Sequence, residues 1–292
     1  MLEIENFNGQ LSQVHTEPKS WSSISEEEYM ADYSIFNYPT YAVAAGTVLF
    51  SILTEAGSNY RKTPEYTLAV LLVRRRAHPQ RGLLAVPGGF LRPEETIEEC
   101  ALREIEEETG VLPDNLVPTG VFSSTDRDPR GRIISHAFLS VLAETVLPSP
   151  GGDAVEADWY TVRLSNKGKA YDLLLEKDGG AASAELLYSE DCANIAKFRT
   201  VKNEELAFDH AEMICSAVTE LRKHVSDFEW LFRFLPEKFT LNDMQQVYET
   251  VMGEKVLTAN FRRKAAEHIS ETDEYTAGTG HRPARLYVKK EM

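Results

Sequence analysis

The sequence has few cysteines, no long apolar run, and no internal repeat or low-complexity segment. Cys100, Cys192 and Cys215 are odd in number and lack metal-ligand spacing, which argues against a disulfide framework and against a CxxC zinc site. The longest mostly apolar run, residues 42–53, is too short to span a bilayer, and the polar, acidic N-terminal segment is unlike a signal peptide. We therefore expect a cytoplasmic protein with no membrane partner.

A surplus of positive charge is also lacking. The 292 residues include 31 Lys+Arg and 46 Asp+Glu, which give a formal net charge of −15. Such a charge argues against a surface that coats nucleic acids or membranes in general. Residues 236–292 differ, because they hold nine basic and nine acidic residues. From the length and this change in charge we predict a lead-in over 1–35, a main domain over 36–235 and a C-terminal domain over 236–292.

Several strands and two helices are expected in the main domain. Segments rich in Val, Ile and Leu predict strands, and the Gly-, Asn- and Pro-containing segments between them predict turns. Two segments have helical spacing, and the first ends at Gly110, which suits the left-handed cap of a helix. The strands are expected at 39–53, 66–74, 116–122, 133–142, 158–163, 171–175 and 184–188, and the helices at 93–109 and 203–225.

The predicted helix 93–109 carries glutamates on its apolar side. At about 100° per residue, Glu104 and Glu108 fall within about 20° of Ile97. Glu107 lies about 80° from Ile97 on the same side. Glutamates on a solvated face need no partner, but carboxylates that face the protein at this spacing repel one another and lose hydration. A divalent cation relieves both effects, and hard oxygen ligands favour Mg²⁺, Mn²⁺ or Ca²⁺ over softer metals.

The turn before this helix supports a metal and phosphate site. Gly88 and Gly89 let the backbone approach an ion or a phosphate without an intervening Cβ. A Gly-Gly pair alone usually marks only a turn. Mg²⁺ in proteins keeps several waters and binds through a few carboxylates and the phosphates of a substrate. The pair and the acidic helix together therefore predict a phosphate-containing substrate.

These residues match a known motif at every fixed position. Gly89, five residues, Glu95 and seven residues lead to the segment Arg103-Glu104-Ile105-Glu106-Glu107-Glu108-Thr109-Gly110-Val111, and this arrangement is the Nudix box. The chain therefore resembles Nudix hydrolases. The resemblance implies an α/β/α sandwich with a mixed sheet and Mg²⁺-dependent hydrolysis of a nucleoside diphosphate linked to another group.

The resemblance also implies roles for individual residues of the box. Glu104, Glu107 and Glu108 are expected to bind the metal, and Gly89 is expected to contribute its backbone carbonyl. Arg103 and Glu95 are expected to be positioning residues, with Arg103 holding the glutamates by ion pairing. In such a site metal ions neutralise the pyrophosphate and orient or deprotonate the attacking water.

Three further segments are similar to those of the bacterial Nudix branch that acts on ADP-ribose. This similarity implies cleavage of ADP-ribose, or of a similar nucleoside diphosphate sugar, to AMP and a sugar phosphate. Arg127, Arg130 and Arg132 lie in one of these segments, where they form either a phosphate-binding clamp or a solvated turn with an Asp–Arg pair. His210, in another, is expected to be packed rather than catalytic. The segments are 126–132, 153–160 and 206–210.

An additional acid is expected from the loop after residue 150. Either Asp153 or Glu156 can supply the carboxylate that a general base or a further metal ligand requires. A loop acid that only faces water is the alternative. The strands expected at 171–175 and 184–188 flank a Gly-Gly turn and predict a hairpin. The insert at 165–200 that contains this hairpin is expected to alter one edge of the pocket.

The C-terminal domain has the pattern of a winged helix-turn-helix. Thr240 and Asp243 form a capping pair before one helix that ends at Gly253. Thr258 is expected to cap a second helix whose apolar stripe is Phe261, Ala265 and Ile269. A Gly-rich loop and a terminal strand follow. We therefore expect a small α+β domain after the Nudix domain.

This domain has two possible roles, DNA binding and packing. The basic residues of the second helix and the wing can contact base edges and phosphates of double-stranded DNA, whereas a dimerisation module would leave them solvated. The residues expected at DNA are Arg262, Arg263, Lys264, Arg282 and Arg285.

The full pattern resembles proteins that join a Nudix domain to a winged helix. This group contains ADP-ribose hydrolases and Nudix-related transcriptional regulators, and its members usually form homodimers. The complete box favours catalysis, and the alternative is a ligand-responsive regulator that senses ADP-ribose or a related sugar metabolite.

Overall fold

The computed structural model describes residues 25–34, 39–55, 65–190, 196–228, 230–276 and 283–290. The chain divides into two compact units, Met1–Ala42 and Val43–Met292. In the first unit, helix α1 (Glu26–Asp32) begins with a capping box between Ser25 and Glu28. The second unit contains the predicted main and C-terminal domains.

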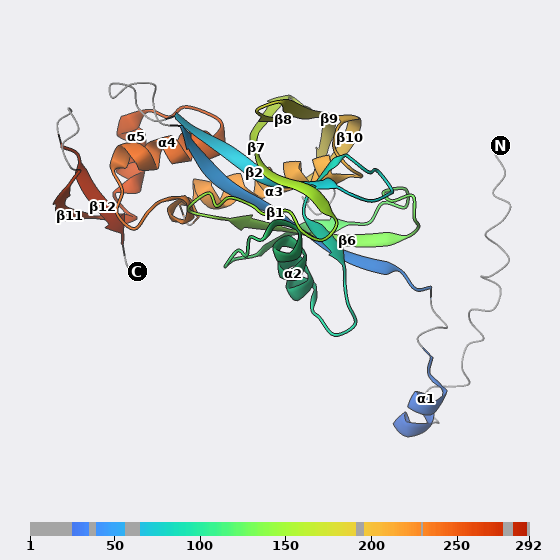
Figure 1. Ribbon diagram of the computed structural model, residues 1–292. Coiled ribbons are helices and arrows are strands. Elements are labelled where there is room, and N and C mark those ends of the chain that lie inside the picture. Colours follow the sequence, from blue (N-terminus) through green and yellow to red (C-terminus); the bar gives the residue numbers. More distant parts are fainter. Residues whose placement is uncertain are drawn as a thin grey trace. The chain divides into compact units, whose positions relative to one another are not determined.

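A ten-stranded sheet forms the centre of the second unit (Figure 1). Its main path runs in the order β10-β9-β8-β7-β2-β1-β6-β5, while β3 pairs with β2 and β4 pairs with β1. The predicted hairpin is present, with Lys177 opposite Gly180 where β8 turns into β9. The strands are β1 (Ala42–Glu55), β2 (Glu65–Arg75), β3 (Leu84–Ala85), β4 (Gly88–Phe90), β5 (Val117–Phe122), β6 (Ile133–Val141), β7 (Ala154–Lys167), β8 (Ala170–Lys177), β9 (Gly180–Glu190) and β10 (Ala196–Glu204).

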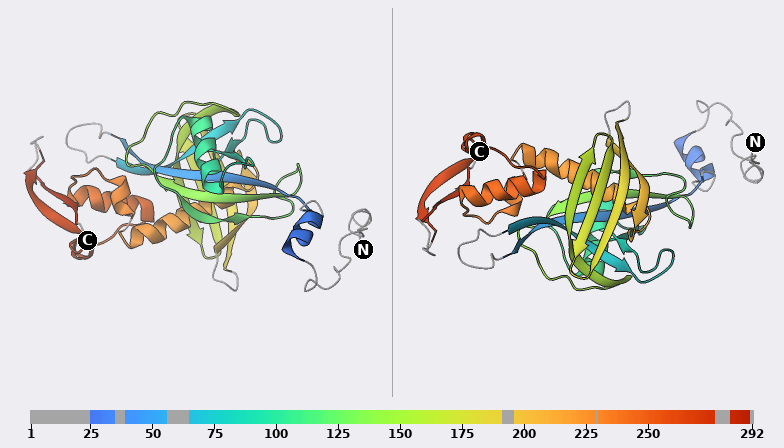
Figure 2. Two further views of the ribbon diagram at one scale, coloured as in Figure 1. Left: turned by 90° about the horizontal axis from the view of Figure 1, so that it is seen from below. Right: turned by 90° about the horizontal axis from the view of Figure 1, so that it is seen from above.

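Helices α2 (Ile97–Thr109) and α3 (His210–Ser226) cover opposite faces of the sheet. Alternation along β1 produces the two layers, because Phe50 packs in the core that contains α3 whereas Leu49 packs with Ile105 of α2. In Figure 2, α2 lies in front of the sheet in the view from below and behind it in the view from above. The α/β/α arrangement expected from the resemblance is confirmed.

Helix α2 begins later than predicted, at Ile97 rather than Pro93. The side chain of Thr96 accepts a hydrogen bond from the Glu99 N–H, and the Glu99 carboxylate accepts one from the Thr96 N–H. This capping box satisfies the first N–H groups of the helix and fixes its start. Pro93 therefore belongs to the preceding turn, while Gly110 ends the helix with φ 69°, as predicted.

The predicted helix over 203–225 is wrong in its first part, because α3 begins at His210. Residues up to Glu204 belong to strand β10. Glu205 and Phe208 have φ values of 69° and 48°, in the left-handed region that a right-handed helix cannot contain. The Asn203 side chain also holds both backbone groups of Leu206, with its amide donating to the carbonyl at 2.8 Å.

The C-terminal region forms the predicted helix-turn-helix and hairpin. After the short helix η3 (Leu231–Phe234) come α4 (Leu241–Met252), α5 (Thr258–Ala265), β11 (Ile269–Tyr275) and β12 (Arg285–Lys289). Thr240 and Asp243 form the expected capping box. Two details were wrong: Leu257 occupies the cap position of α5 without a side-chain hydrogen bond, and Ile269 begins β11 instead of extending α5.

The C-terminal region shares the core of the main domain. The Phe228 ring stacks on His268 with ring centroids 4.9 Å apart, and Arg222 of α3 donates to the Val251 carbonyl of α4 at 3.1 Å. The Tyr66 hydroxyl of β2 donates to Asp243 at 3.2 Å. One apolar cluster runs from the sheet through α3 into α4 and α5. None of the described helices has the length and apolar character needed to cross a membrane.

The capping box predicts the stability of the α2 region. Thr96→Ala removes the hydroxyl acceptor, so we expect the free energy of unfolding to fall by about 1 kcal/mol in urea denaturation. The control is Glu98→Ala, since Glu98 is exposed on the same helical turn, and it should change stability by less than about 0.5 kcal/mol. Equal effects of the two substitutions would contradict the role given to Thr96.

Candidate active site

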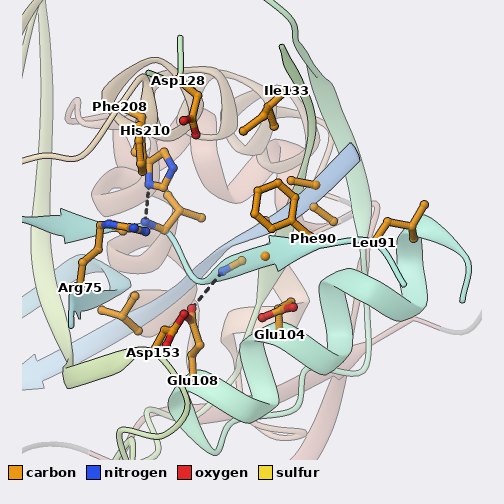
Figure 3. Close-up of a pocket in the computed structure, with 18 of the residues that line it drawn as sticks. Arg75, Phe90, Leu91, Glu104, Glu108, Asp128, Ile133, Asp153, Phe208 and His210 are labelled. Atoms are coloured by element: carbon orange, nitrogen blue, oxygen red, sulfur yellow. Dashed lines mark hydrogen bonds between the residues drawn. The ribbon is translucent and has the colours of Figure 1, made fainter. Parts of the chain in front are cut away.

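A pocket of about 560 Å³ brings the predicted metal-binding residues together with Asp153 (Figure 3). Its walls come from β4, α2, the ends of β2 and β3, the loops around residues 128 and 152, and the start of α3. The acidic part contains Glu104, Glu107 and Glu108 of α2 and Asp153 from the loop before β7. These four carboxylates therefore share one pocket, although β7 lies far from the box in sequence.

The glycine turn fits closely against the acidic helix. A Cβ atom on Gly89 would overlap the carboxyl group of Glu104, and a Cβ on Gly88 would overlap the Ala45 carbonyl of β1. The Gly88 N–H donates to Glu108 Oε2 at 3.1 Å. Position 88 thus requires glycine because its close neighbours are backbone atoms, whereas a side chain at position 89 would displace the Glu104 carboxyl group.

Glu108 is a buried acid of the pocket, with a residue exposure of 8%. Burial, together with the charges of Glu104 and Asp153, raises its pKa to about 7, against the opposing effect of the Gly88 N–H. A cation that binds in the pocket would offset this effect by stabilising the ionised form of Glu108.

Arg103 organises the outer part of the acidic cluster. Its guanidinium donates to both oxygens of Glu95, at 2.6 and 2.8 Å, to Glu104 at 2.5 Å, and to Glu107 at 3.3 Å. The hydrogen bonds from Arg103 lower the pKa of Glu95 to about 2. The structure thus places Arg103 and Glu95 as a pair that fixes the orientation of the neighbouring glutamates.

Glu107 does not turn inward as its helical angle suggested. Its side chain is 45% exposed and accepts from Arg92 and Arg103 at the rim of the pocket. Among the residues that the structure describes, no three acidic, histidine or cysteine side chains already form a set of metal ligands. The arginines neutralise Glu104 and Glu107 in this arrangement, which explains how the cluster forms.

The donor set nevertheless fits a hard divalent cation. Glu108 and Asp153 have no arginine or lysine ion pair within the described part of the chain, and the Gly89 position leaves no room for a side chain beside Glu104. Carboxylate and backbone oxygens are the ligands that Mg²⁺ and Mn²⁺ prefer. A cation at this position would also favour the ionised form of Glu108.

The two candidate acids, Asp153 and Glu156, differ in whether they line the pocket. Asp153 lines the pocket beside Glu108 (Figure 3). Glu156 does not line it, and accepts instead from Arg74 at 3.0 Å and Lys177 at 2.6 Å. The structure therefore brings Asp153, and not Glu156, to the acidic cluster.

The predicted arginine clamp is largely occupied by internal ion pairs. Arg127 donates with two nitrogens to Asp209 at 2.7 and 2.8 Å, and Arg130 does the same with Asp128 at 2.8 and 3.0 Å. Both line the pocket, but Arg132 does not and donates to the Ser123 carbonyl. Arg130 also lies 5.0 Å from the ring centroid of Phe90.

Other residues of the pocket were missed in the sequence, among them Arg75, Phe90 and Phe208. Phe90 occupies a variable position of the box, Arg75 and Phe208 stand outside it, and only the fold shows that the three line one pocket. His210 is packed, as expected: its Nδ1 accepts from the Val86 N–H at 2.9 Å, and burial lowers its pKa to about 4, which keeps the imidazole neutral.

A second candidate site is the exposed face of α5. Arg262, Arg263 and Lys264 are all exposed. Arg285 on the wing pairs with Glu271 and donates to the Tyr275 hydroxyl at 2.8 Å. The predicted DNA contact Arg282 lies outside the described residues.

Comparison with known proteins identifies both parts of the second unit. Residues 60–173 match the NUDIX domain, and residues 231–288 match the NrtR DNA-binding winged helix domain. The chain therefore joins a Nudix domain to a C-terminal winged-helix domain of the NrtR type.

Individual relatives agree with this division. An ADPR responsive transcriptional repressor, NtrR, from Acinetobacter baylyi is 24% identical over 267 residues, which cover 90% of this chain and 88% of the relative. An ADP-ribose pyrophosphatase from Methanocaldococcus jannaschii is 45% identical over 91 residues, or 31% of this chain and 53% of that protein. A MutT/nudix family protein from Enterococcus faecalis superposes with a TM-score of 0.69 at 25% identity, covering 91% of this chain and 94% of the other.

The raised pKa of Glu108 predicts a pH-dependent stability. A carboxyl whose pKa rises from 4.5 to about 7 on folding binds more protons in the folded state between these values, so stability falls as pH rises through that range. Glu108→Gln removes this effect. In EDTA, its unfolding free energy relative to wild type should increase by about 3 kcal/mol between pH 4.5 and pH 8.

The measurement is urea denaturation of both proteins at several pH values. Glu106→Gln, an exposed change on the same helix, should show no such trend relative to wild type. A difference between Glu108→Gln and wild type that is independent of pH would contradict the assigned burial of the charge.

Proposed function

We propose that this protein is a Mg²⁺-dependent Nudix pyrophosphohydrolase that cleaves ADP-ribose, or a similar nucleoside diphosphate sugar, to AMP and a sugar phosphate. The observation that carries the proposal is the meeting of Glu104, Glu108 and Asp153 with the glycine turn in one pocket. The 45% identity to an ADP-ribose pyrophosphatase over 91 residues supports the substrate. A cytoplasmic location and a homodimer belong to the same proposal.

The metal would be held by Glu104, Glu107 and Glu108 with the Gly89 carbonyl. When bound, it would neutralise phosphate charge and lower the pKa of a coordinated water. Arg103 is held by Glu95 and donates to Glu104. This hydrogen bond would keep the Glu104 carboxylate in one orientation when a metal ion binds. Glu107 lies at the rim and is already half exposed, so replacing its arginine partners by a metal ion would cost little free energy.

Asp153 would accept a proton from the attacking water. It lines the same part of the pocket as Glu108 and comes from another element. Its backbone carbonyl accepts the Arg76 N–H at 2.8 Å, which fixes the loop against the end of β2. Glu156 has no such position, since its two cationic partners hold it outside the pocket.

The catalytic test is AMP release from ADP-ribose with Mg²⁺. Glu108→Gln keeps the shape of the side chain but removes a charged ligand, so turnover should fall by at least about 100-fold, because even outer-shell changes reduce activity by about 10–100-fold. Glu106→Gln should retain wild-type turnover. Unchanged turnover by Glu108→Gln would refute the role of this residue, and no AMP from wild type would refute the substrate.

A second candidate function is ligand-responsive DNA binding. It is favoured by the match to the NrtR winged helix and by the Acinetobacter relative, which is an ADPR responsive transcriptional repressor. The basic face of α5 provides the physical basis. Phe261 and Ala265 are its buried residues, and Arg263 lies about 180° from their mean direction around the helix. Arg262 and Lys264 lie at its flanks.

This geometry assigns different roles to the basic residues of α5. A side chain at the centre of the exposed face would reach base edges in the major groove, whereas flanking residues would contact phosphates. The pocket can influence this face because α3 lines the pocket at His210 and packs on α4 through Arg222. If ADP-ribose weakens DNA binding, DNA must weaken ADP-ribose binding by the same factor.

The DNA test uses a duplex selected by the wild-type chain from a random pool, with a scrambled duplex for comparison. Arg263→Ala should reduce the preference for the selected duplex by about 1–3 kcal/mol. Lys264→Ala should weaken both duplexes equally and reduce the salt slope by about one. Failure of wild type to select any duplex at low salt would refute this function.

A further inference from the structure

Arg75 is a pocket arginine without an ion pair among the residues that the structure describes. It lies at the end of β2 and points into the pocket (Figure 3). Its Nε donates to the Pro79 carbonyl at 3.1 Å, and its guanidinium carbon lies 4.9 Å from the centre of the Phe208 ring. These contacts hold the side chain without neutralising its charge.

The other arginines of the pocket already have carboxylate partners. Arg92 pairs with Glu107 at 3.3 Å, Arg127 with Asp209 at 2.7 Å, and Arg130 with Asp128 at 2.8 Å. An incoming anion would compete with that carboxylate at each of them, so part of the attraction would be lost. Arg75 can accept an anion without such a loss.

We propose that Arg75 binds the diphosphate of the ligand, facing the metal-binding carboxylates across the pocket. This inference rests on the proposed function, because it takes the pocket to be a site for a nucleoside diphosphate. It moves the anion-binding role from the arginine turn 127–132 to the end of β2. The planar guanidinium offers two parallel N–H groups that match a pair of phosphate oxygens.

The backbone holds Arg75 in this direction. Side chains alternate along β2, so Val73 and Arg75 both face the pocket and Arg74 faces the other side. Arg74 consequently pairs with Glu156 outside the pocket, whereas Arg75 lines it. The Arg75 N–H donates to the Leu83 carbonyl at 3.0 Å, and its own carbonyl accepts the Gly82 N–H at 2.9 Å.

The aromatic support of Arg75 is fixed as well. The Phe208 N–H donates to the Gln80 side chain at 2.6 Å, and Gln80 belongs to the same turn as Pro79. One turn therefore holds both the guanidinium and the ring against which it stacks. This preorganisation lowers the entropy lost when a ligand binds.

The charges around Arg75 favour an anionic ligand. Burial and the nearby charge of Arg130 lower the pKa of Arg75, while Glu108, Asp128 and Asp153 act in the opposite direction from beyond ion-pairing distance. A half-buried cation without a contacting anion is less favourable than a paired one. A diphosphate would supply the missing contact on one side and meet the metal site on the other.

The experiment is calorimetric titration of the full chain with methylenediphosphonate at saturating Mg²⁺. This probe is a diphosphate analogue whose carbon bridge resists hydrolysis, and it carries no nucleoside or sugar. Arg75→Gln should raise its Kd about 10- to 100-fold, as expected for hydrogen bonds to a charged group. Arg75→Lys should recover part of the affinity, because it restores the charge without the fork.

The matched control is Arg81→Gln, which removes the same charge from the same turn at an exposed position outside the pocket. Its Kd for the diphosphonate should stay within about twofold of wild type, as for surface changes in general. Mg²⁺ alone provides a structural control, because loss of a nearby cation should leave Mg²⁺ binding equal or tighter. A purely structural Arg75 would instead lose Mg²⁺ affinity and thermal stability together.

Several outcomes would overturn the assignment. Wild-type diphosphonate affinity in Arg75→Gln, no diphosphonate binding by the wild-type chain, or a parallel loss of Mg²⁺ affinity and melting temperature in Arg75→Gln would each refute it. If wild type released no AMP from ADP-ribose but its diphosphonate binding depended on Arg75, the proposed substrate would fail and the anion site would stand. If ADP-ribose turnover were normal but diphosphonate binding did not depend on Arg75, the substrate would stand and the anion site would fail.

Discussion

The close approach of the glycine turn to helix α2 is the constraint on which the site depends. Side chains at positions 88 and 89 would collide with the Ala45 carbonyl and with the Glu104 carboxyl. Glycine at both positions lets β4 pair with β1 while the acidic face of α2 packs directly beneath it. The Gly88 N–H then donates to Glu108, whose charge is otherwise disfavoured by burial. The acidic side of α2 can therefore face the protein, because it packs against a glycine turn that has no side chains.

The acidic residues in and around the pocket form two groups, which differ in how their negative charge is balanced by arginines. Glu95, Glu104 and Glu107 share Arg103 and Arg92, so this outer group is neutralised by fixed cations of the chain. Glu108 and Asp153 face Arg75 only at a distance, so the inner group is compensated weakly. A cation bound between acids and an anion bound at Arg75 would each relieve one of these imbalances. This arrangement suits a metal ion and a diphosphate that bind together, because the charge of each reduces the unfavourable field around the other.

The sequence predicted the part of the site that lies on one continuous helix and its preceding turn. Helical spacing placed Glu104 and Glu108 correctly toward the protein, because both lie close to the apolar axis of α2. Glu107 lies further around and its exposure depends on the rim formed by Arg92, which spacing cannot show. The choice between Asp153 and Glu156 was open because it depends on the partners of Glu156, Arg74 and Lys177, which come from other strands. Arg75 was missed for a related reason: only the fold shows that the end of β2 reaches the pocket.

Helix α3 connects the two candidate functions physically. It has 17 residues, or about 25 Å at 1.5 Å per residue. Its first turn supplies a wall of the pocket, and Asp209 just before it holds Arg127 in a buried ion pair. Its last turns lie in the apolar cluster that also contains Met244 of α4 and Phe261 of α5. Close packing resists independent movement of its two ends. A ligand that displaced the first turn would therefore strain the packing beneath the basic face of α5, so that hydrolysis and DNA binding would share one structural element.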